Sequence, residues 1–421
     1  MKILVDALNF ELPHGTGIKT YSRNVISALS HHGHSVDLLS EKSIATIKSV
    51  SPIASYLAAI SSNSTGRTNL SSRIISKLHG RNHSGIVGLR EVEIRHLLAI
   101  TQTKEWECID QMRVFPGLFV KSFIRSGLGL GVSTIPKSSN ADALFLTSPI
   151  PVYLSRGLNI LTVHDIIPLT HPWLLDRWTT IAKAIGSTLE GLFKKVDKVI
   201  CVSETTRQQL LSRFTVDERK LHVVYQPCKF SNMGETWDEL TEHNILEGLG
   251  LTNEPYVLFV GAIEPKKNVL NLLNAFKFNN RLPKLVLVGP FAWSSEKERA
   301  LITSMPEKVR HLGYLTDNEL YVLQKHAKTF VFPSIVEGFG LPVVEAMWQG
   351  VPCVVSDIPV FRELFHNYAV FVDPYDSWSI SEGITSAINS DCIDRDAMIE
   401  FVRKKFSFKS FSESLKNTVC A

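Results

Sequence analysis

Cysteine is scarce in this chain, and its spacing excludes two classes of stabilised protein. None of the six cysteines forms a C-x-x-C pair, and no histidine cluster stands near them at metal-ligand spacing. Neither a disulfide framework nor a structural zinc site is therefore expected. Isolated, reduced thiols are typical of cytosolic proteins. The six are Cys108, Cys201, Cys228, Cys353, Cys392 and Cys420.

Long apolar runs are also lacking. The first residues, Met1–Asp6, reach an acidic side chain after three apolar ones, which is too early for the core of a secretory signal. No apolar run approaches the length of about 20 residues that spans a bilayer. The sequence therefore predicts a cytoplasmic protein that is neither secreted by this route nor integral to a membrane.

A dense basic surface is missing as well, because the net charge is only +4. Residues 41–140 nevertheless hold 13 Lys and Arg against 6 Asp and Glu, a local charge of +7 that leaves −3 for the remainder. Nucleic acid is not expected as a partner, since it usually needs a denser basic face. The local excess, with apolar and basic residues mixed at 119–125, suits peripheral contact with the anionic inner face of the plasma membrane. An ordinary solvated surface explains the excess equally well.

What the chain does have is length and a regular alternation of elements. Its 421 residues exceed the size at which one hydrophobic core stops growing, so two domains are expected. Short apolar runs alternate with helical patterns, which is typical of α/β domains with parallel sheets. The expected strands are residues 2–8, 35–40, 143–146, 159–164 and 198–203 in the first half, and 256–261, 284–289, 329–332, 352–356 and 370–373 in the second.

The chain divides into three segments by this pattern. Residues 1–227 form an N-terminal domain, within which residues 41–140 predict no element clearly. The polar stretch around residues 226–241, with its proline and glycine, marks the boundary to a second domain at 228–394. Residues 395–421 are helical in pattern and are not followed by a strand, so they are expected to cross back to the N-terminal domain.

Ligands of parallel α/β sheets bind beyond the carboxyl ends of the strands, so the loops there are candidate sites. Gly15 and Gly17 precede a helix and let backbone amides approach an anion, although a plain tight turn explains them as well. His164 ends a strand, where it can contact a sugar hydroxyl or serve as a structural histidine. Lys266 and Lys267 follow another strand end and can neutralise a diphosphate.

The most unusual loop runs from Phe332 to Ala346. Glu337 lies in the loop, whereas Glu345 lies inside an apolar helix, where a carboxylate is costly unless it is paired or binds something. The free amides at the helix start supply an anion site beside both carboxylates. The residues that carry these amides are Gly338, Phe339, Gly340 and Leu341.

The run from Glu337 to Glu345 resembles the E-x7-E signature of family four of the retaining GT-B glycosyltransferases, also called glycosyl transferases group 1. Further segments agree in order and spacing, so the resemblance covers most of the chain outside 41–140. These segments are Gly15–Gly17, His164–Asp165, Val202–Glu204, Gly261–Asn268 and Val354–Asp357.

The resemblance implies a GT-B fold, in which two Rossmann-like, doubly wound parallel-sheet domains face each other across a cleft. It implies that the C-terminal domain binds a nucleotide-sugar donor and that the N-terminal domain binds the acceptor. Lys267, with Lys266, would hold the diphosphate, and Gly15 and Gly17 would approach it. Glu345 would contact the ribose. Glu337 and the amides after it would hold the transferred sugar, which His164 would face.

Two departures from the family pattern change these expectations. Many relatives carry a phosphate-binding arginine where this chain has Ala262, so phosphate binding would depend more on the two lysines. Many relatives carry an Asn-Gly pair after the strand where this chain has Tyr-Gln-Pro-Cys at 225–228, so the hinge between the domains would differ from theirs. The family needs no divalent metal, and no metal or other cofactor is expected here.

The resulting hypothesis is a retaining, metal-independent glycosyltransferase of cell-surface polysaccharide assembly, such as lipopolysaccharide synthesis. It would move a hexose or deoxyhexose from a nucleotide-diphosphate sugar to a glycan or lipid-linked glycan. One alternative is a sugar-nucleotide 2-epimerase of the same architecture, against which the E-x7-E loop speaks. A non-catalytic GT-B scaffold is the other, and the intact His164, Lys267, Glu337 and Glu345 speak against it.

Overall fold

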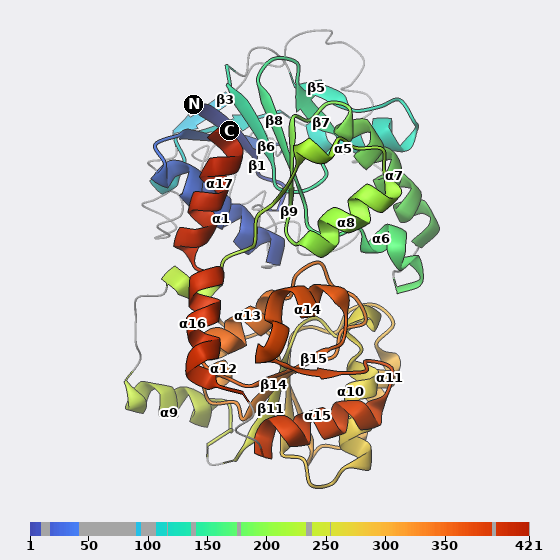
Figure 1. The fold of residues 1–421 in the computed structure, drawn as a ribbon, viewed down its shortest axis with the longest axis vertical. Helices are drawn as coiled ribbons and strands as arrows, with labels where there is room; N and C mark the ends of the chain where they lie inside the picture. The colour runs from blue at the N-terminus through green and yellow to red at the C-terminus, as the bar shows by residue number, and fades with distance from the viewer. Residues whose placement is uncertain are drawn as a thin grey trace, which may run out of the picture.

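The computed structural model describes residues 1–9, 17–41, 90–93, 107–115, 117–135, 140–174, 178–232, 238–252, 254–389 and 393–420. Two α/β domains lie one above the other along the long axis of the molecule, and both ends of the chain lie in the N-terminal domain (Figure 1). Gly15 and most of residues 41–140 lie outside the described residues.

The N-terminal domain is built on an eight-stranded sheet in the order β10-β9-β8-β6-β1-β2-β4-β3, parallel except for the β3–β4 pair. Its inner strands are buried on both faces, which explains their continuous apolar runs. The strands are β1 (Lys2–Asp6), β2 (Ser35–Ser40), β3 (Arg90–Glu93), β4 (Gln111–Val114), β6 (Ala143–Leu146), β8 (Leu158–Val163), β9 (Lys198–Cys201) and β10 (Leu221–Val223), with a separate parallel pair of β5 (Ser133–Ile135) and β7 (Val152–Leu154).

Helices cover both faces of this sheet. One core lies under α1, whose buried stripe includes Tyr21, Val25 and Leu29 at helical spacing. The other core receives Phe119 from α5 and Leu189 from α7. The helices are α1 (Gly17–His31), α5 (Leu118–Gly127), α6 (Ile167–Thr170), η4 (Pro172–Leu174), α7 (Trp178–Phe193), α8 (Glu204–Arg213) and η5 (Glu218–Lys220).

The C-terminal domain contains a six-stranded, wholly parallel sheet in the order β13-β12-β11-β14-β15-β16. Its strands are β11 (Tyr256–Val260), β12 (Lys284–Val288), β13 (Val309–Gly313), β14 (Thr329–Phe332), β15 (Cys353–Ser356) and β16 (Val370–Val372). Its helices are η6 (Lys229–Asn232), α9 (Glu239–Gly248), η7 (Pro265–Lys267), α10 (Val269–Phe278), α11 (Glu296–Ser304), α12 (Asp317–Lys325), α13 (Leu341–Trp348), α14 (Pro359–Phe365), η8 (His366–Tyr368) and α15 (Ser377–Asn389).

The segment expected as one helical unit at 395–421 is divided into two helices. α16 (Arg395–Lys405) packs on α13, and its Met398 and Val402 belong to the C-terminal core. The C-terminal domain therefore extends past the expected limit at residue 394. α17 (Phe408–Cys420) packs on α1, and its Phe411, Leu415 and Val419 lie in the N-terminal core.

The chain thus crosses between the domains twice, at residues 225–228 and again at 406–408. The two crossings lie together, because the amide of Cys228 donates to the carbonyl of Phe406 at 2.9 Å. The expected α/β class with two parallel-sheet domains is confirmed. Within the parts that the structure describes, no helix is both long and apolar enough to cross a bilayer.

Candidate functional site

The loop between β14 and α13 holds the two glutamates of the E-x7-E run. Gly340 precedes α13 with a φ of 117°, and a Cβ atom there would lie 2.8 Å from the Phe361 ring. Only glycine fits both conditions, so the loop must turn into the helix at this point. Pro342 in the first turn needs no amide partner and fixes the helix start. Glu345 therefore lies on the helix and Glu337 in the loop before it.

Glu337 forms an ion pair with Lys267, and 2.5 Å separates Oε1 from Nζ. Its side chain is only 9% exposed, and burial by itself would raise the pKa of this carboxyl. The ammonium groups of Lys267 and Lys266 outweigh that effect and hold the pKa of Glu337 below its ordinary value. Glu337 is consequently an anion in the resting site.

Lys266 and Lys267 come from η7, which follows β11 directly. The amide of Ile335 donates to the carbonyl of Lys266 at 2.8 Å, so the loops after β11 and β14 are joined. Lys266 pairs with Glu264 at 3.4 Å, and this carboxylate and that of Glu337 raise the pKa of Lys266 to about 12 against the effect of burial. Lys266 is therefore charged at neutral pH, and both lysines stand at the carboxyl edge of the sheet, where a diphosphate would need them.

Glu345 has different surroundings from Glu337. Its nearest cation is Lys229 of η6, at 3.7 Å, and Lys229 also contacts Asp317 at 3.1 Å. Burial raises the pKa of Glu345 to about 7, although the Lys229 ammonium counteracts the shift. Among the described residues, the cations paired with Glu337 and those paired with Glu345 do not overlap. The two glutamates therefore have different electrostatic surroundings.

His164 directly follows β8 on the N-terminal side of the cleft. Its Nε2 donates to the carbonyl of Thr147 at 2.9 Å, and the edge of the Tyr21 ring packs on it at 4.8 Å between centroids. Burial lowers the pKa of His164, so the imidazole is neutral at pH 7. The amide of Thr147 in turn donates to the buried carboxylate of Asp6. Asp6 and Tyr21, which sequence reasoning missed, thereby fix the position of the imidazole.

The two domains meet directly at the E-x7-E loop. A Cβ atom on Gly338 would lie 2.1 Å from the carbonyl oxygen of His164, so only glycine allows this approach. The hydroxyl of Ser203 donates to the carbonyl of Gly338 at 2.9 Å. A Cβ atom on Gly17, at the start of α1, would meet the Leu341 side chain at 3.5 Å. The structure therefore brings His164, Gly17 and the loop together.

The residues of the expected amide site differ in what they offer. Phe339 turns its side chain into the core, against the rings of Tyr225 and Phe406, which leaves its backbone for a ligand. Gly338 and Gly340 present backbone only, and Leu341 opens the helix. Gly15 lies outside the described residues.

Glu363 is a contact between the domains that sequence reasoning missed. From α14 in the C-terminal domain, its carboxylate accepts hydrogen bonds from the amides of Glu204 and Thr205, each at 2.7 Å. The hydroxyl of Thr205 donates to it at 2.6 Å. These amides are at the N-terminus of α8, where helix geometry leaves N–H groups unpaired and favours negative charge. No motif in the sequence pairs these two helices.

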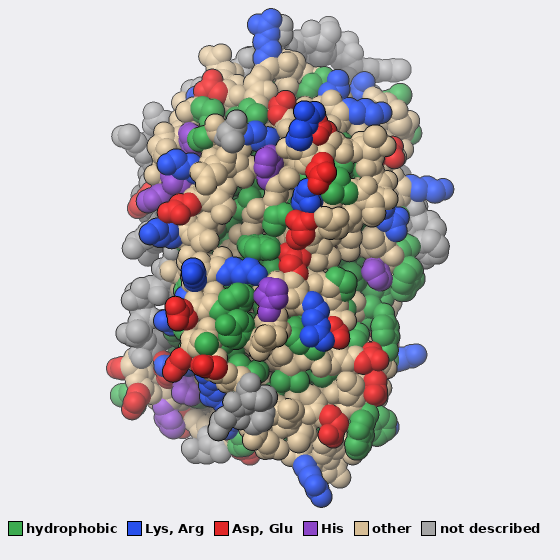
Figure 2. Space-filling model, viewed as in Figure 1, with side chains coloured by type: hydrophobic (Ala, Val, Ile, Leu, Met, Phe, Trp, Pro, Cys, Tyr) green, Lys and Arg blue, Asp and Glu red, His purple; other side chains and the backbone are tan. Residues whose placement is uncertain are grey.

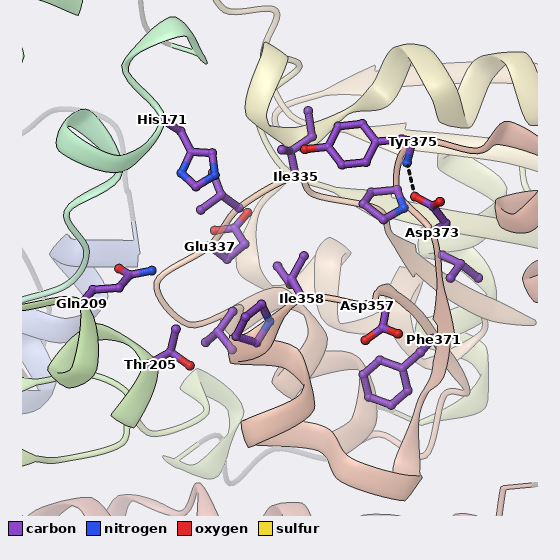
Figure 3. A pocket seen from close by; sticks show the side chains of 15 residues that line it. His171, Thr205, Gln209, Ile335, Glu337, Asp357, Ile358, Phe371, Asp373 and Tyr375 are labelled. Atoms are coloured by element: carbon purple, nitrogen blue, oxygen red, sulfur yellow. Dashed lines mark hydrogen bonds between the residues drawn. The ribbon is translucent and has the colours of Figure 1, made fainter. Parts of the chain in front are cut away.

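A cavity of about 610 Å³ opens between the domains beside Glu337 (Figure 3). The N-terminal domain lines it with His171, Thr205 and Gln209. The C-terminal domain lines it with residues at and beyond the ends of β14, β15 and β16, at 335–337, 357–360 and 371–375. Lys266, Lys267 and Glu345 do not line it, so Glu337 stands between this cavity and the lysine pair.

Two parallel-sheet domains that face each other across a cleft are the architecture of GT-B glycosyltransferases. The family model of glycosyl transferases group 1 matches residues 243–405, and that of glycosyltransferase family 4 matches residues 136–228. Together the two models match more than half of the chain. Both matched models describe glycosyltransferase families, as the E-x7-E resemblance predicts.

Curated relatives and solved structures agree with this assignment. O-antigen chain mannosyltransferase B of Escherichia coli is 29% identical over 58% of this chain and 64% of its own length. O-antigen chain mannosyltransferase RfbU of Salmonella typhimurium is 32% identical over 52% of this chain and 58% of its own length. The alignments thus span about three fifths of these relatives. Anabaena HepE, solved with UDP and glucose, shares the fold at a TM-score of 0.66, 14% identity and full coverage of both chains. WaaG, a glycosyltransferase involved in lipopolysaccharide biosynthesis, shares the fold at a TM-score of 0.62 and 12% identity, with 99% of each chain covered.

Proposed function

We propose that this protein transfers a hexose or deoxyhexose from a nucleotide-diphosphate sugar to a glycan or lipid-linked glycan in cell-surface polysaccharide synthesis. The observation that carries the proposal is the meeting of His164, Lys267 and Glu337 at the carboxyl edges of two facing sheets. The names of the O-antigen mannosyltransferase relatives support the polysaccharide context.

The contacts suggest a role for each residue. Lys266 and Lys267, with the amides that open α13, would neutralise the diphosphate as it leaves. Glu337 would contact the transferred sugar, where positive charge develops as the bond to phosphate breaks. Glu345 would accept hydrogen bonds from the ribose. The neutral His164 would donate to or accept from a hydroxyl of the sugar, facing it from the N-terminal domain.

The reaction we propose retains the anomeric configuration. The bond from the anomeric carbon to the phosphate oxygen breaks, and a new bond to the acceptor hydroxyl forms on the same face. The hydroxyl proton passes to the leaving phosphate, and nucleoside diphosphate departs. A mechanism through a covalent intermediate would need a carboxylate pair flanking one bond. The different surroundings of Glu337 and Glu345 favour the front-face route instead.

Metal independence is part of the same proposal. Two charged lysines and a helix N-terminus supply the charge neutralisation for which other transferases use a divalent ion. The protein would therefore need neither a metal nor another cofactor, and its donor would be its only nucleotide ligand.

We also propose a peripheral contact between α5 and an anionic membrane. The helix buries Phe119 and Ser122 but exposes 54% of Val120 and 59% of Ile124. Lys121 and Arg125 are exposed beside these apolar side chains. An apolar face flanked by cations is the pattern of helices that lie in a lipid interface. The face of the molecule in Figure 2 mixes acidic and basic side chains and does not form a broad basic surface. The proposed membrane contact therefore rests on the side chains of α5.

A thermal-shift screen with UDP-, GDP-, dTDP- and ADP-sugars tests the proposed function. A donor that binds only the folded state raises the melting temperature, and the matching sugar nucleotide should then be hydrolysed slowly without acceptor. Interconversion of the sugar nucleotide instead of hydrolysis would reveal an epimerase. Neither binding nor turnover with any of the four would reveal a non-catalytic scaffold.

A further inference from the structure

The cavity beside Glu337 has the size and the location of a substrate site. Its volume of about 610 Å³ lies within the range of roughly 300–1,000 Å³ typical of small-molecule sites. It opens at the carboxyl ends of β14, β15 and β16, where ligands of parallel sheets bind. In Figure 3 Glu337 is drawn between His171 on one side and Ile358 on the other. The cavity therefore reaches the carboxylate to which the transferred sugar is assigned.

The polar residues of its lining do not include a cation. Among the residues that the structure describes, no Lys or Arg lines this cavity, whereas Glu337, Asp357 and Asp373 do. Asp357 is paired with Arg362 through two hydrogen bonds of 2.6 and 2.7 Å. Burial lowers the pKa of His171, so no positive charge comes from this histidine at neutral pH. A phosphate or a uronate would find carboxylates here and no free cation to pair with.

The same lining suits an uncharged sugar ring. The side-chain amide of Gln209 both donates and accepts, and the Asp373 carboxylate accepts hydrogen bonds from hydroxyl groups. Asp373 already accepts from the amide of Tyr375 at 2.8 Å, which fixes its orientation. Tyr375, 69% exposed, offers a ring face against which the apolar face of a pyranose can pack.

We propose that this cavity binds the acceptor, and that the group it takes is an uncharged pyranose whose reacting hydroxyl points to Glu337. The inference rests on the proposed function and adds the place and the charge of the acceptor residue. If the acceptor is linked to a lipid diphosphate, that diphosphate lies outside this cavity, because the lining offers it no cation. Both domains line the cavity, so the site is complete only when they are closed. The C-terminal domain supplies most of the lining, so this proposal differs from the N-terminal acceptor site that the family resemblance implies.

Saturation-transfer NMR tests the inference without requiring turnover. The probes are methyl α-D-mannopyranoside and methyl α-D-glucopyranoside as neutral sugars, and methyl α-D-glucuronide as an anionic one. We expect at least one neutral glycoside to receive saturation from the full-length protein and the glucuronide to receive none. Gln209→Ala and Tyr375→Ala should each reduce the signal at least fivefold.

Two matched variants serve as controls. Gln208→Ala changes the neighbouring residue of α8, and Trp378→Ala removes an aromatic ring that is 63% exposed outside the cavity. Both should leave the signal at the wild-type level, and melting temperatures should show that all four variants fold. A signal that survives both lining variants, a signal for the glucuronide alone, or no signal for either neutral glycoside would overturn the inference.

The two proposals fail in different ways. If a nucleotide sugar binds and is hydrolysed but the lining variants do not affect glycoside binding, the inference is wrong and the proposed function stands. If no nucleotide sugar binds or turns over, the proposed function is wrong, and the assignment of this cavity to an acceptor fails with it.

Discussion

Glu337 and Glu345 are separated by seven residues in the chain, yet their charges are controlled by different neighbours. Lysines hold Glu337 as an anion, whereas burial raises the pKa of Glu345 to about 7. A contact made equally in the ground and transition states affects KM, and one strengthened in the transition state affects kcat. The two residues should therefore differ in kinetics as well.

We expect Glu345→Gln to raise the donor KM with little change in kcat, and Glu337→Gln to lower kcat. Steady-state kinetics of both variants with the donor identified by thermal shift would measure this, with melting temperatures recorded alongside. Equal losses of kcat at unchanged KM and unchanged stability would contradict the division of roles. A large drop in the melting temperature of Glu345→Gln alone would mean that Glu345 is a structural carboxylate.

Lys267 is expected to stabilise the departing diphosphate. Lys267→Ala should cost on the order of 2–4 kcal/mol of transition-state stabilisation, by analogy with a lost oxyanion donor. The single variant also leaves Glu337 buried without its closest cation, which destabilises the fold. The double variant Lys267→Ala/Glu337→Gln should therefore recover melting temperature but not kcat/KM. Lys277→Ala, at an exposed position of α10, is the matched control. Wild-type kcat/KM in Lys267→Ala would exclude the proposed role.

Single residues also show what the sequence could and could not predict about the site. Glu337, the lysine pair and His164 were identifiable because each follows a strand end, and Glu345 because it is a carboxylate within an apolar helix. Asp6, Lys229 and Glu363 were not, because each acts on a residue far away in the chain. Asp6 contacts Thr147, Lys229 contacts Glu345 and Glu363 contacts Thr205. Such pairs exist only once the sheets have formed.

At the scale of elements, we expect the contact between α14 and α8 to help hold the domains closed. Glu363→Gln keeps the side-chain length but removes the charge that the α8 N-terminus favours. Charge-assisted hydrogen bonds contribute about 1.5–3 kcal/mol, so the closed arrangement should become less populated. Small-angle scattering without ligand should report a larger radius of gyration, which a bound donor should reduce. Glu382→Gln, at an exposed site of α15, is the control. Scattering identical to the wild type would show that Glu363 does not keep the domains closed.

A second prediction at the scale of elements concerns membrane binding through the exposed face of α5. The wild-type protein should float with liposomes that contain anionic lipid at low salt, and Val120→Glu/Ile124→Glu should remain in solution. The control Leu240→Glu replaces a side chain that is 68% exposed on α9 and should float like the wild type. A wild-type protein that stays in solution would rule out the membrane contact.

Several apolar strands were predicted closely, whereas the edge strand β13 (Val309–Gly313) was missed. The strand expected at 329–332 coincides with β14, and that at 35–40 with β2. β13 was not expected, because it is an edge strand in which only Val309 is fully buried and Arg310 and His311 interrupt the apolar pattern. Short strands at an edge carry little hydrophobic signal of their own.

For the whole molecule, the proposed neutralisation of the donor diphosphate by Lys266 and Lys267 predicts activity without a metal. Turnover should be unchanged in EDTA, because the lysines are part of the fold and cannot be removed by a chelator. A metal-dependent phosphatase assayed in the same buffer would confirm that chelation is complete. Loss of turnover in EDTA that magnesium or manganese restores would contradict metal independence.

The second crossing of the chain fixes the order in which the N-terminal domain can be completed. The apolar face of α1 is covered by Phe411, Leu415 and Val419 of α17, each of which contributes roughly 1.5–3 kcal/mol by burial. During synthesis, α1 leaves the ribosome long before residues 408–420 exist, because the C-terminal domain is made in between. The core of the N-terminal domain is therefore completed only after the C-terminal domain has been synthesised. A truncation before Phe408 would leave this apolar face of α1 exposed to water, even though the cut lies beyond the C-terminal domain.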